Sequence, residues 1–191
     1  SHIRVGTFQY VTMQELYLDH GGTTPHRVLS YIGAVGANML QLAGRIADGA
    51  IINSNHTSSA VRRAVEHISI GADSAGRSLN TIDRMKILPV KVSRDKKSTL
   101  KSMKPRLALY LAQQPHIEGP SEADPELVER IKQIIHWPAT QDEAFKGASF
   151  ISDDLVDSLG CYGDEDEVNA RLHEFRVAGM TAPIVPEATP E

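Results

Sequence analysis

Residues 31–53 read YIGAVGANMLQLAGRIADGAIIN and hold the pattern that decides the fold. Just before and into this run, residues 28–32 are rich in β-branched and aromatic residues and stop at Gly33, as expected for a buried strand. Over residues 37–47 apolar side chains recur at helical spacing, and after Asp48 and Gly49 the apolar run 50–52 predicts a second buried strand. A strand, a helix and a strand in this order predict a parallel βα unit.

The same alternation continues along the chain. Thr57 or Ser58 caps the next predicted helix, and Gly76 ends it. A third strand is predicted over residues 85–93, with Pro89 indicating a bulge or an edge. Helices over 98–113 and from Asp124 onward form an insert. The last unit has helices over 153–159 and 164–178 and a strand over 182–185.

Four convincing core strands are too few for a complete eight-stranded barrel, which takes about 250 residues. We therefore predict an α/β fold that is a partial (β/α)8 TIM barrel, with about four parallel strands and an inserted helical segment. Residues 1–27 are predicted as loop and one short strand leading into the barrel, 28–185 as the half-barrel domain, and 186–191 as a tail. Such a sheet would leave two open edges and an uncovered inner face. We expect a truncated product or an assembly that completes the barrel, either a homo-oligomer or a missing N-terminal half.

Composition excludes several classes of partner. Lys and Arg total 20 against 24 Asp and Glu, and no basic stripe with interleaved aromatic residues is present, so no nucleic-acid partner is expected. No stretch approaches the roughly 20 apolar residues of a membrane-spanning helix, so no membrane partner is expected. The single cysteine, Cys161, and the lack of a signal-peptide pattern predict a cytoplasmic protein.

The run 31–53 resembles the signature of the luciferase-like oxidoreductase superfamily, which includes bacterial luciferase and coenzyme F420-dependent enzymes. In that family a strand, a small-Gly-Pro turn, a helix with Leu-Ala-Gly, and then Ala-Asp-Gly lead into the next strand. Here Leu42-Ala43-Gly44 and Ala47-Asp48-Gly49 match, whereas Ala37 stands where proline is common. Residues 64–67 with 71–77 are similar to the following helix of the family and its Ala-Gly-Arg ending, and residues 163–168 to a later family segment. The resemblance covers about 28–185, is closest to the F420-dependent methylene-tetrahydromethanopterin reductase branch, and identifies the chain with the C-terminal half of the barrel.

The first candidate site surrounds Gly36. A glycine at the carboxyl end of a parallel strand lets a ligand approach the backbone, while the N–H groups of the following helix face an anion. The resemblance implies that Val35, Gly36, Asn38 and Met39 line the phosphate or ribityl side of the cofactor. The alternative is a tight βα turn that holds no ligand.

A second group of candidates follows the next two strands, on the same face of the barrel. The resemblance to F420 sugar dehydrogenases implies that Asn53 and His56 contact substrate or cofactor; the alternative for His56 is a solvated residue before the helix cap. Arg94 could bind a phosphate or polyglutamate tail, or be an ordinary surface charge. Asp48 precedes its strand, so we predict that it accepts backbone N–H bonds and has no catalytic role.

The remaining candidates are weaker. His116, His136 and His173 lack metal-ligand spacing, and no metal site is predicted. Cys161, in a predicted loop at 160–163, is interpreted as a small buried thiol, and the acidic run 164–167 as a helix cap.

The resemblance implies an oxidoreductase that binds reduced F420, or alternatively FMN, at the barrel mouth and passes a hydride to a small-molecule substrate. In the family, the ring-facing acidic residues come mostly from the first four βα units, so no catalytic residue is assigned and the chain alone is expected to be inactive. The alternatives are an FMN-dependent luciferase-like monooxygenase and a non-catalytic flavin-binding or half-barrel protein.

Overall fold

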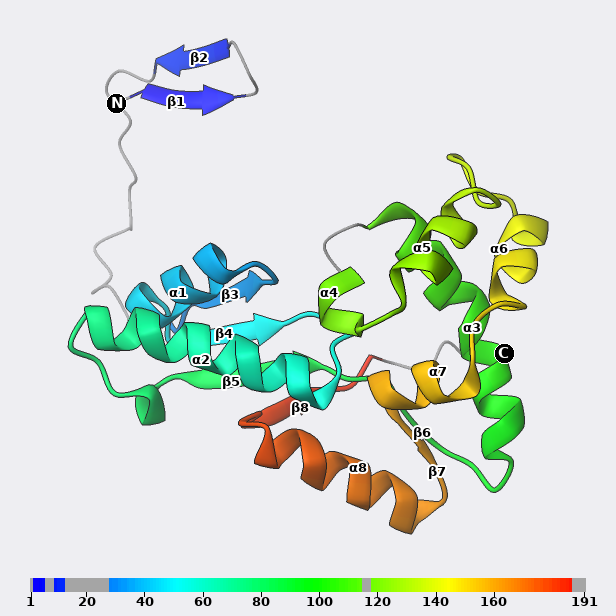
Figure 1. Ribbon diagram of the computed structural model, residues 1–191. Helices are drawn as coiled ribbons and strands as arrows, with labels where there is room; N and C mark the ends of the chain where they lie inside the picture. Colours follow the sequence, from blue (N-terminus) through cyan, green and yellow to red (C-terminus); the bar gives the residue numbers. More distant parts are fainter. Residues whose placement is uncertain (1, 6–8, 13–27, 115–117, 187–191) are drawn as a thin grey trace, which may run out of the picture.

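The computed structural model describes residues 2–5, 9–12, 28–114 and 118–186. Near the N-terminus, β1 (His2–Val5) and β2 (Gln9–Thr12) pair as an antiparallel ladder, which lies apart from the rest of the molecule (Figure 1). The sequence predicts one short strand in this segment, whereas its described part contains two.

The main sheet has four parallel strands in the order β3 (Tyr31–Ala34), β4 (Gly49–Ile52), β5 (Asp83–Ile87) and β8 (Ala182–Ile184). These are the four predicted strands, although the first begins three residues later than expected. Within the described residues β3 and β8 each pair on one side only, so the sheet is not closed into a barrel. The predicted α/β half-barrel is confirmed.

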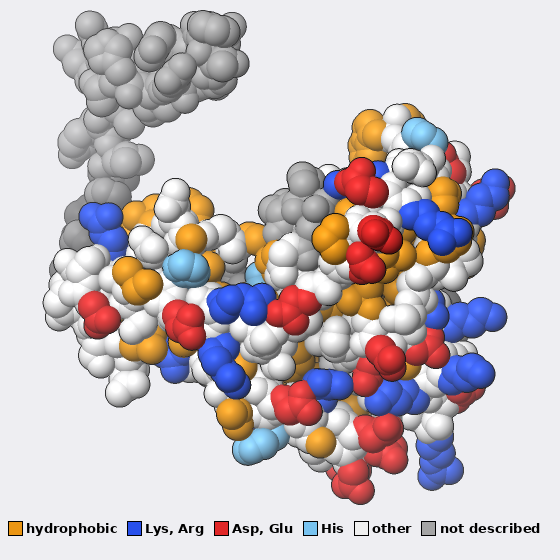
Figure 2. Space-filling model, viewed as in Figure 1, with side chains coloured by type: hydrophobic (Ala, Val, Ile, Leu, Met, Phe, Trp, Pro, Cys, Tyr) orange, Lys and Arg blue, Asp and Glu red, His pale blue; other side chains and the backbone are white. Residues whose placement is uncertain are grey.

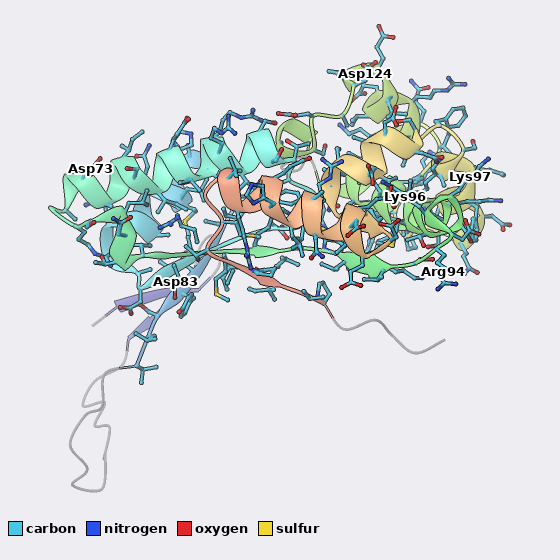
Figure 3. All side chains as sticks on the ribbon, turned by 90° about the horizontal axis from the view of Figure 1, so that it is seen from below. Asp73, Asp83, Arg94, Lys96, Lys97 and Asp124 are labelled. Carbon is cyan, nitrogen blue, oxygen red and sulfur yellow. The ribbon has the colours of Figure 1, made fainter. Side chains whose placement is uncertain are left out.

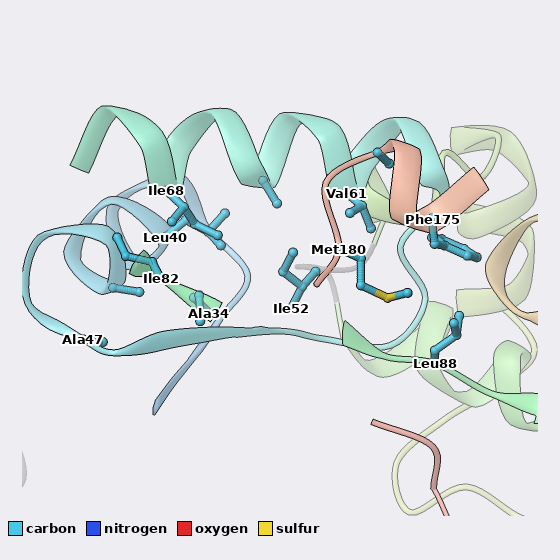
Figure 4. Close-up of a cluster of buried hydrophobic side chains, with 14 of the residues drawn as sticks. Ala34, Leu40, Ala47, Ile52, Val61, Ile68, Ile82, Leu88, Phe175 and Met180 are labelled. Atoms are coloured by element: carbon cyan, nitrogen blue, oxygen red, sulfur yellow. The ribbon is translucent and has the colours of Figure 1, made fainter. Parts of the chain in front are cut away.

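Helices α1 (Ala37–Ile46), α2 (Ser58–Ser74) and α8 (Glu165–Val177) cover one face of this sheet (Figure 1). The core between them holds Leu40, Ile52, Ile68 and Phe175 (Figure 4). Side chains alternate across a strand, so the neighbours of core residues point to the opposite face. On that face Ile51, Met85, Ile87 and Ile184 are only half-buried, which is the uncovered inner face that the sequence predicts.

Small residues bring α1 and α2 into close contact. A Cβ on Gly71 would collide with the Gln41 carbonyl oxygen, and one on Gly44 would collide with the Ile68 carbonyl oxygen. The glycine of the Leu-Ala-Gly motif is therefore required by packing between the two helices. Gly49 of Ala-Asp-Gly has a similar role, because an added Cβ would collide with the Tyr31 ring.

The third predicted strand breaks at Leu88 and Pro89. Beyond them β6 (Val90–Val92) leaves the main sheet and pairs in parallel with β7 (Cys161–Gly163). Proline has no N–H to donate, but its carbonyl accepts a bond from the Cys161 N–H at 2.9 Å. The sequence indicates the bulge at Pro89, whereas the loop predicted at 160–163 is wrong because residues 161–163 form a strand.

Between β6 and β7 the chain forms what we call the helical insert: α3 (Lys96–Gln113), α4 (Glu118–Ser121), α5 (Pro125–Lys132), α6 (Gln141–Ala148) and α7 (Asp153–Leu159). It has its own apolar core, which includes Leu111, Ile131 and Tyr162. Figure 1 shows the insert beyond the carboxyl ends of the main strands. The sequence predicts α3, α5 and α7 but neither α4 nor α6.

Acidic and basic side chains intermingle over the face of the molecule in Figure 2, in agreement with the mixed charge of the sequence. None of the helices in the described ranges is long and apolar enough to span a membrane.

Candidate functional site

A cavity of about 320 Å³ opens where the carboxyl ends of the main strands meet the helical insert. Parallel strands place the loops after their carboxyl ends at one edge of the sheet, which is where α/β barrels bind ligands. The lining comes from the loop after β4, from β5, β6 and β7, from α3 and α7, and from the segment after β8; it includes Ser54, Asn55, Pro89, Lys91, Met103, Arg106, Tyr110, Tyr162 and Pro186. We call it the strand-end cavity.

The polar groups of the strand-end cavity are cationic or neutral. The Arg106 Nη2 donates a hydrogen bond of 3.1 Å to the Tyr110 hydroxyl, and the guanidinium carbon lies 5.5 Å from the Tyr110 ring centroid. Lys91 adds a second, exposed cation. Burial raises the pKa of Tyr162, so its hydroxyl stays neutral. This set can bind an anionic group and donate hydrogen bonds, but the sequence did not single out these residues.

The bend at Gly36 has the predicted geometry. Gly36 links β3 to α1 with an extended backbone (φ −83°, ψ 156°), and no side chain caps the first turn of α1. Gly36 and Asn38 are exposed, Met39 is 44% exposed and Val35 is half-buried. An added Cβ on Gly36 would meet no atom within 4 Å, so neither packing nor a left-handed backbone requires glycine here. An open helix N-terminus at the carboxyl edge of the sheet fits an anion, while a cofactor role for these four residues stays a prediction.

The loop after β4 differs in detail from the expectation. The Asn53 Oδ1 accepts a bond of 2.8 Å from the Ser54 N–H, and Asn55 has a left-handed backbone (φ 59°). His56 is only 2% exposed, and its Nδ1 lies 3.1 Å from the Ser54 carbonyl oxygen. The alternative of a solvated His56 is therefore wrong. Ser54 and Asn55 line the strand-end cavity, whereas Asn53 and His56 are not in its lining, so their contact roles remain predictions.

Arg94 lies outside the strand-end cavity. It is exposed just after β6, and Figure 3 shows it at the periphery near Lys96 and Lys97. The next residue, Asp95, caps α3 by accepting a bond of 2.9 Å from the Ser98 N–H. Its position suits the alternative of a surface charge, and a substrate contact remains a prediction.

Several structural predictions hold. The Asp48 Oδ2 accepts a bond of 2.8 Å from the Ser30 N–H, as expected of a residue that orders the turn. Cys161 is fully buried, and burial raises its pKa to about 12, so the thiol is a poor nucleophile at neutral pH. Asp164 and Glu167 form a reciprocal capping box at the start of α8. His116 lies outside the described residues.

Sequence reasoning gave little weight to Lys86 on β5. Its side chain is fully buried between the sheet and α8, with Nζ 5.2 Å from the Phe175 ring centroid and 3.1 Å from the Ile87 carbonyl oxygen. Burial lowers the pKa of Lys86 to about 7. Its register partner Ile52 is a core residue, so pairing β4 with β5 in the sequence could have revealed a lysine at a core position.

Comparison with known proteins gives consistent matches. A sequence model of the family described as luciferase-like monooxygenase matches residues 7–182. The chain is 28% identical over 164 residues to the 5,10-methylenetetrahydromethanopterin reductase of Archaeoglobus fulgidus, covering 84% of this chain and 48% of that protein. It is 28% identical over 156 residues to the enzyme of the same name from Methanopyrus kandleri, covering 81% and 43%. The chain thus spans about half the length of the curated relatives it matches.

Solved structures agree with this pattern. The coenzyme F420-dependent tetrahydromethanopterin reductase from Methanopyrus kandleri superposes with a TM-score of 0.70 at 27% identity, over 82% of this chain and 44% of that one. An F420-dependent secondary alcohol dehydrogenase in complex with an F420–acetone adduct gives a TM-score of 0.62 at 14% identity, over 84% and 43%, which supports the fold alone.

Proposed function

The chain belongs to the luciferase-like monooxygenase family, and on that premise we propose that it forms the C-terminal half of an F420-dependent oxidoreductase similar to methylene-tetrahydromethanopterin reductase. The observation that carries the proposal is the open N-terminus of α1 at Gly36, at the same sheet edge as the strand-end cavity. The first two curated relatives reduce methylenetetrahydromethanopterin according to their names, and the similar solved structure is that of a coenzyme F420-dependent reductase.

The residues of the chain fit the anionic part of such a cofactor. The first-turn N–H groups of α1 point outward at the carboxyl edge of the sheet, and the open space beside Gly36 lets a phosphate approach the backbone. When bound, F420 supplies the hydride; the protein binds and orients it. We propose that Val35, Gly36, Asn38 and Met39 contact the cofactor.

The substrate side is proposed at the loop after β4 and at the strand-end cavity. Lys91 and Arg106 would hold an anionic group of a small-molecule substrate, and the neutral Tyr162 hydroxyl would donate a hydrogen bond. Three further residues remain candidate contacts: Asn53 and His56 in the loop after β4, and Arg94 after β6. No catalytic acid or base is assigned to this chain.

We further propose that turnover needs a second half-barrel. The inner face of the sheet carries the half-buried Ile51, Met85, Ile87 and Ile184, and β3 and β8 leave open edges among the described strands. A complementary N-terminal half or a second copy in a homo-oligomer would cover both. The proposed location is cytoplasmic.

The test is a titration of the isolated chain with F420 and with FMN, followed by an assay of F420H2 oxidation. We expect F420 to bind more tightly than FMN, without turnover. Gly36→Ala should weaken F420 binding about tenfold, because its methyl group enters the space that the phosphate needs. Gly119→Ala is the matched control, since its Cβ also meets nothing within 4 Å but lies in α4.

Three results would change the proposal. Tighter binding of FMN would favour an FMN-dependent monooxygenase. Failure of both cofactors to bind, with a stable dimer in sedimentation, would favour a non-catalytic half-barrel. Turnover at the rate of a full-length relative would refute the need for a second half.

A further inference from the structure

A second hollow lies in the helical insert, on the other side of α3 from the strand-end cavity. It measures about 880 Å³ and is bounded by α3, by residues 137–141 and by α6. We call it the Trp137 groove. Its α3 residues include Ser98, Ser102 and Leu109, whereas Met103, Leu107 and Tyr110 on the same helix face the strand-end cavity. Arg106 lines both hollows, so the two sites on either side of α3 share one guanidinium.

The walls of the Trp137 groove are aromatic. Trp137 is 81% exposed and Phe145 is 60% exposed, although both are apolar residues that normally lose solvent contact on folding. Pro105 and Pro138 add apolar surface to the same lining. Exposed aromatic faces gathered in one groove of this volume are typical of a site that stacks on a planar ligand.

The segment that carries Trp137 is held firmly. The Glu143 carboxylate accepts hydrogen bonds from the Thr140 N–H and hydroxyl, both at 2.8 Å, and its Oε1 lies 3.1 Å from the His136 Nδ1. These contacts lower the pKa of Glu143 to about 2, so the bracing carboxylate stays charged at neutral pH. These bonds hold residues on both sides of Trp137, so the backbone that carries it is ordered before a ligand binds and loses little entropy on binding.

The charge of the Trp137 groove is of one sign. Lys101 and Arg106 are its charged residues, and no aspartate or glutamate occurs in the lining. At one end Gln113 carries a buried amide nitrogen, Nε2, that has no hydrogen-bond partner among the described residues. That nitrogen is shielded from solvent, so the charge that a ligand in the groove would meet comes from Lys101 and Arg106.

From these features we infer that the Trp137 groove binds a small planar aromatic carboxylate, with its ring stacked on Trp137 and its carboxylate held by Lys101, the cation that lines this groove alone. The proposal does not rest on the oxidoreductase function, although the two sites share Arg106 as a lining residue. A second copy of the chain is the rival occupant, but the charged residues of the groove, Lys101 and Arg106, are both cationic, so two such grooves facing one another would repel.

Trp137 makes the test direct, because it is the single tryptophan of the chain and gives one indole N–H resonance. We would titrate the full chain with naphthalene-2-carboxylate and follow that resonance by proton–nitrogen NMR, with calorimetry for affinity. Naphthalene-2-carboxamide keeps the ring and removes the charge, and cyclohexanecarboxylate keeps the charge and removes the aromatic plane. We expect a saturable shift with the first compound and affinities about tenfold weaker with the other two.

Matched variants distinguish a specific contact with Lys101 from a general effect of the charge of α3 on binding. Lys101→Met should weaken binding of naphthalene-2-carboxylate about tenfold, whereas Lys97→Met removes the same charge from α3 outside the lining and should leave binding unchanged. Trp137→Ala should abolish saturable binding. This variant has no indole resonance, so its binding is measured by calorimetry. Because Trp137 is 81% exposed, its removal takes little buried surface from the fold, and the remaining NMR resonances check that the variant is folded.

Three outcomes would overturn the proposal. They are the absence of a saturable shift, equal affinity for the carboxylate and the carboxamide, and a dimer that Trp137→Ala converts to a monomer. The last would show that a second copy covers the groove.

Discussion

The half-barrel and the helical insert each have an apolar core, but the two regions build their cores differently. In the half-barrel, buried strands and helices alternate, and glycines let α1 approach α2 closely. In the insert, consecutive helices pack on α3, and larger side chains such as Leu111 and Ile131 fill the core. Tight backbone packing in one region and side-chain packing in the other predict different responses to substitution.

The two regions meet where β5 continues into β6 and where β6 pairs with β7. β5 belongs to the main sheet and β6 to the small sheet with β7, and only Leu88 and Pro89 separate them. On β7, Cys161 lies in the core of the half-barrel while its neighbour Tyr162 lies in that of the insert. The strand-end cavity is formed at this junction, so its shape depends on both cores.

The largest expected effect is at the contact between α1 and α2. Gly71→Val would push side-chain atoms into the Gln41 backbone, so we expect the free energy of unfolding to fall by at least about 4 kcal/mol. Hydrogen exchange followed by segment should show lost protection in α2 and β4 and smaller losses in α5. Gly36→Ala, with open space around its Cβ, is the control. Equal losses in α2 and α5 would mean that the two cores unfold as one.

A change of opposite sign is expected at Lys86. Free lysine has a pKa of 10.5, and burial lowers that of Lys86 to about 7. Between these values the unfolded chain binds a proton that the folded chain lacks, so the free energy of unfolding rises with pH from about 7 to about 10.5. Lys86→Met should remove this dependence and stabilise the protein at pH 7 by roughly 3 to 4 kcal/mol.

Chemical denaturation at several pH values measures the Lys86 effect. Burial is the main cause of the lowered Lys86 pKa, and Cys161 would oppose it only as a thiolate, whereas its thiol stays protonated over this range. Lys91→Met is the matched control, because Lys91 is exposed on β6. A stability difference between wild type and Lys86→Met that stays constant with pH would contradict the buried, neutral lysine.

A smaller effect distinguishes two cations near the junction. Lys91 lines the strand-end cavity, whereas Arg94 lies at the periphery. We expect Lys91→Met to weaken binding of an anionic substrate or cofactor about tenfold and Arg94→Met about twofold at most, because Lys91 lines the strand-end cavity and Arg94 lies outside it. Calorimetric titration at two salt concentrations measures both. A larger loss for Arg94→Met would restore Arg94 as the substrate contact.

The half-barrel could be predicted from the sequence because local patterns agree with its packing. Apolar strands, the caps at Thr57 and Asp164, and the stop at Gly76 each appear in a short stretch of residues. Such signals are local, so they can be recognised without knowledge of the tertiary structure. The bend at Gly36 was found for the same reason.

The insert and the strand-end cavity depend on contacts between distant residues. β7 is three residues long and exists because Val90 to Val92 pair with it, a partner some 70 positions away that no local pattern specifies. Arg106 and Tyr110 belong to a helix that the sequence predicts, but only the packing of α3 against β7 and α7 directs them into the cavity. In the loop after β4, the backbone turns at Asn55, which is left-handed. Ser54 and Asn55 line the cavity there, whereas Asn53 and His56 do not.

The smallest expected loss of stability is at the N-terminal cap of α6, which can be compared with the cap of α8. Thr140 and Glu143 form a capping box in the insert, as Asp164 and Glu167 do in the half-barrel. Thr140→Ala should lower the free energy of unfolding by about 1 kcal/mol, and Asp164→Ala should have a similar cost. Calorimetric melting of both variants measures these losses.

Acid should affect the insert cap through Glu143, whose pKa is lowered from 4.5 to about 2 by the bonds from Thr140 and His136. Because the folded-state pKa is the lower one, the stabilisation is complete above about 4.5 and disappears as the pH falls through about 2. In the wild type, the protection of the α6 backbone amides against hydrogen exchange should therefore decline as the pH falls between these values. In Thr140→Ala the protection should already be lower at the start. Protection in α6 that does not change with pH would mean that the insert is held by its apolar core alone, and the Trp137 groove would then lack its bracing carboxylate.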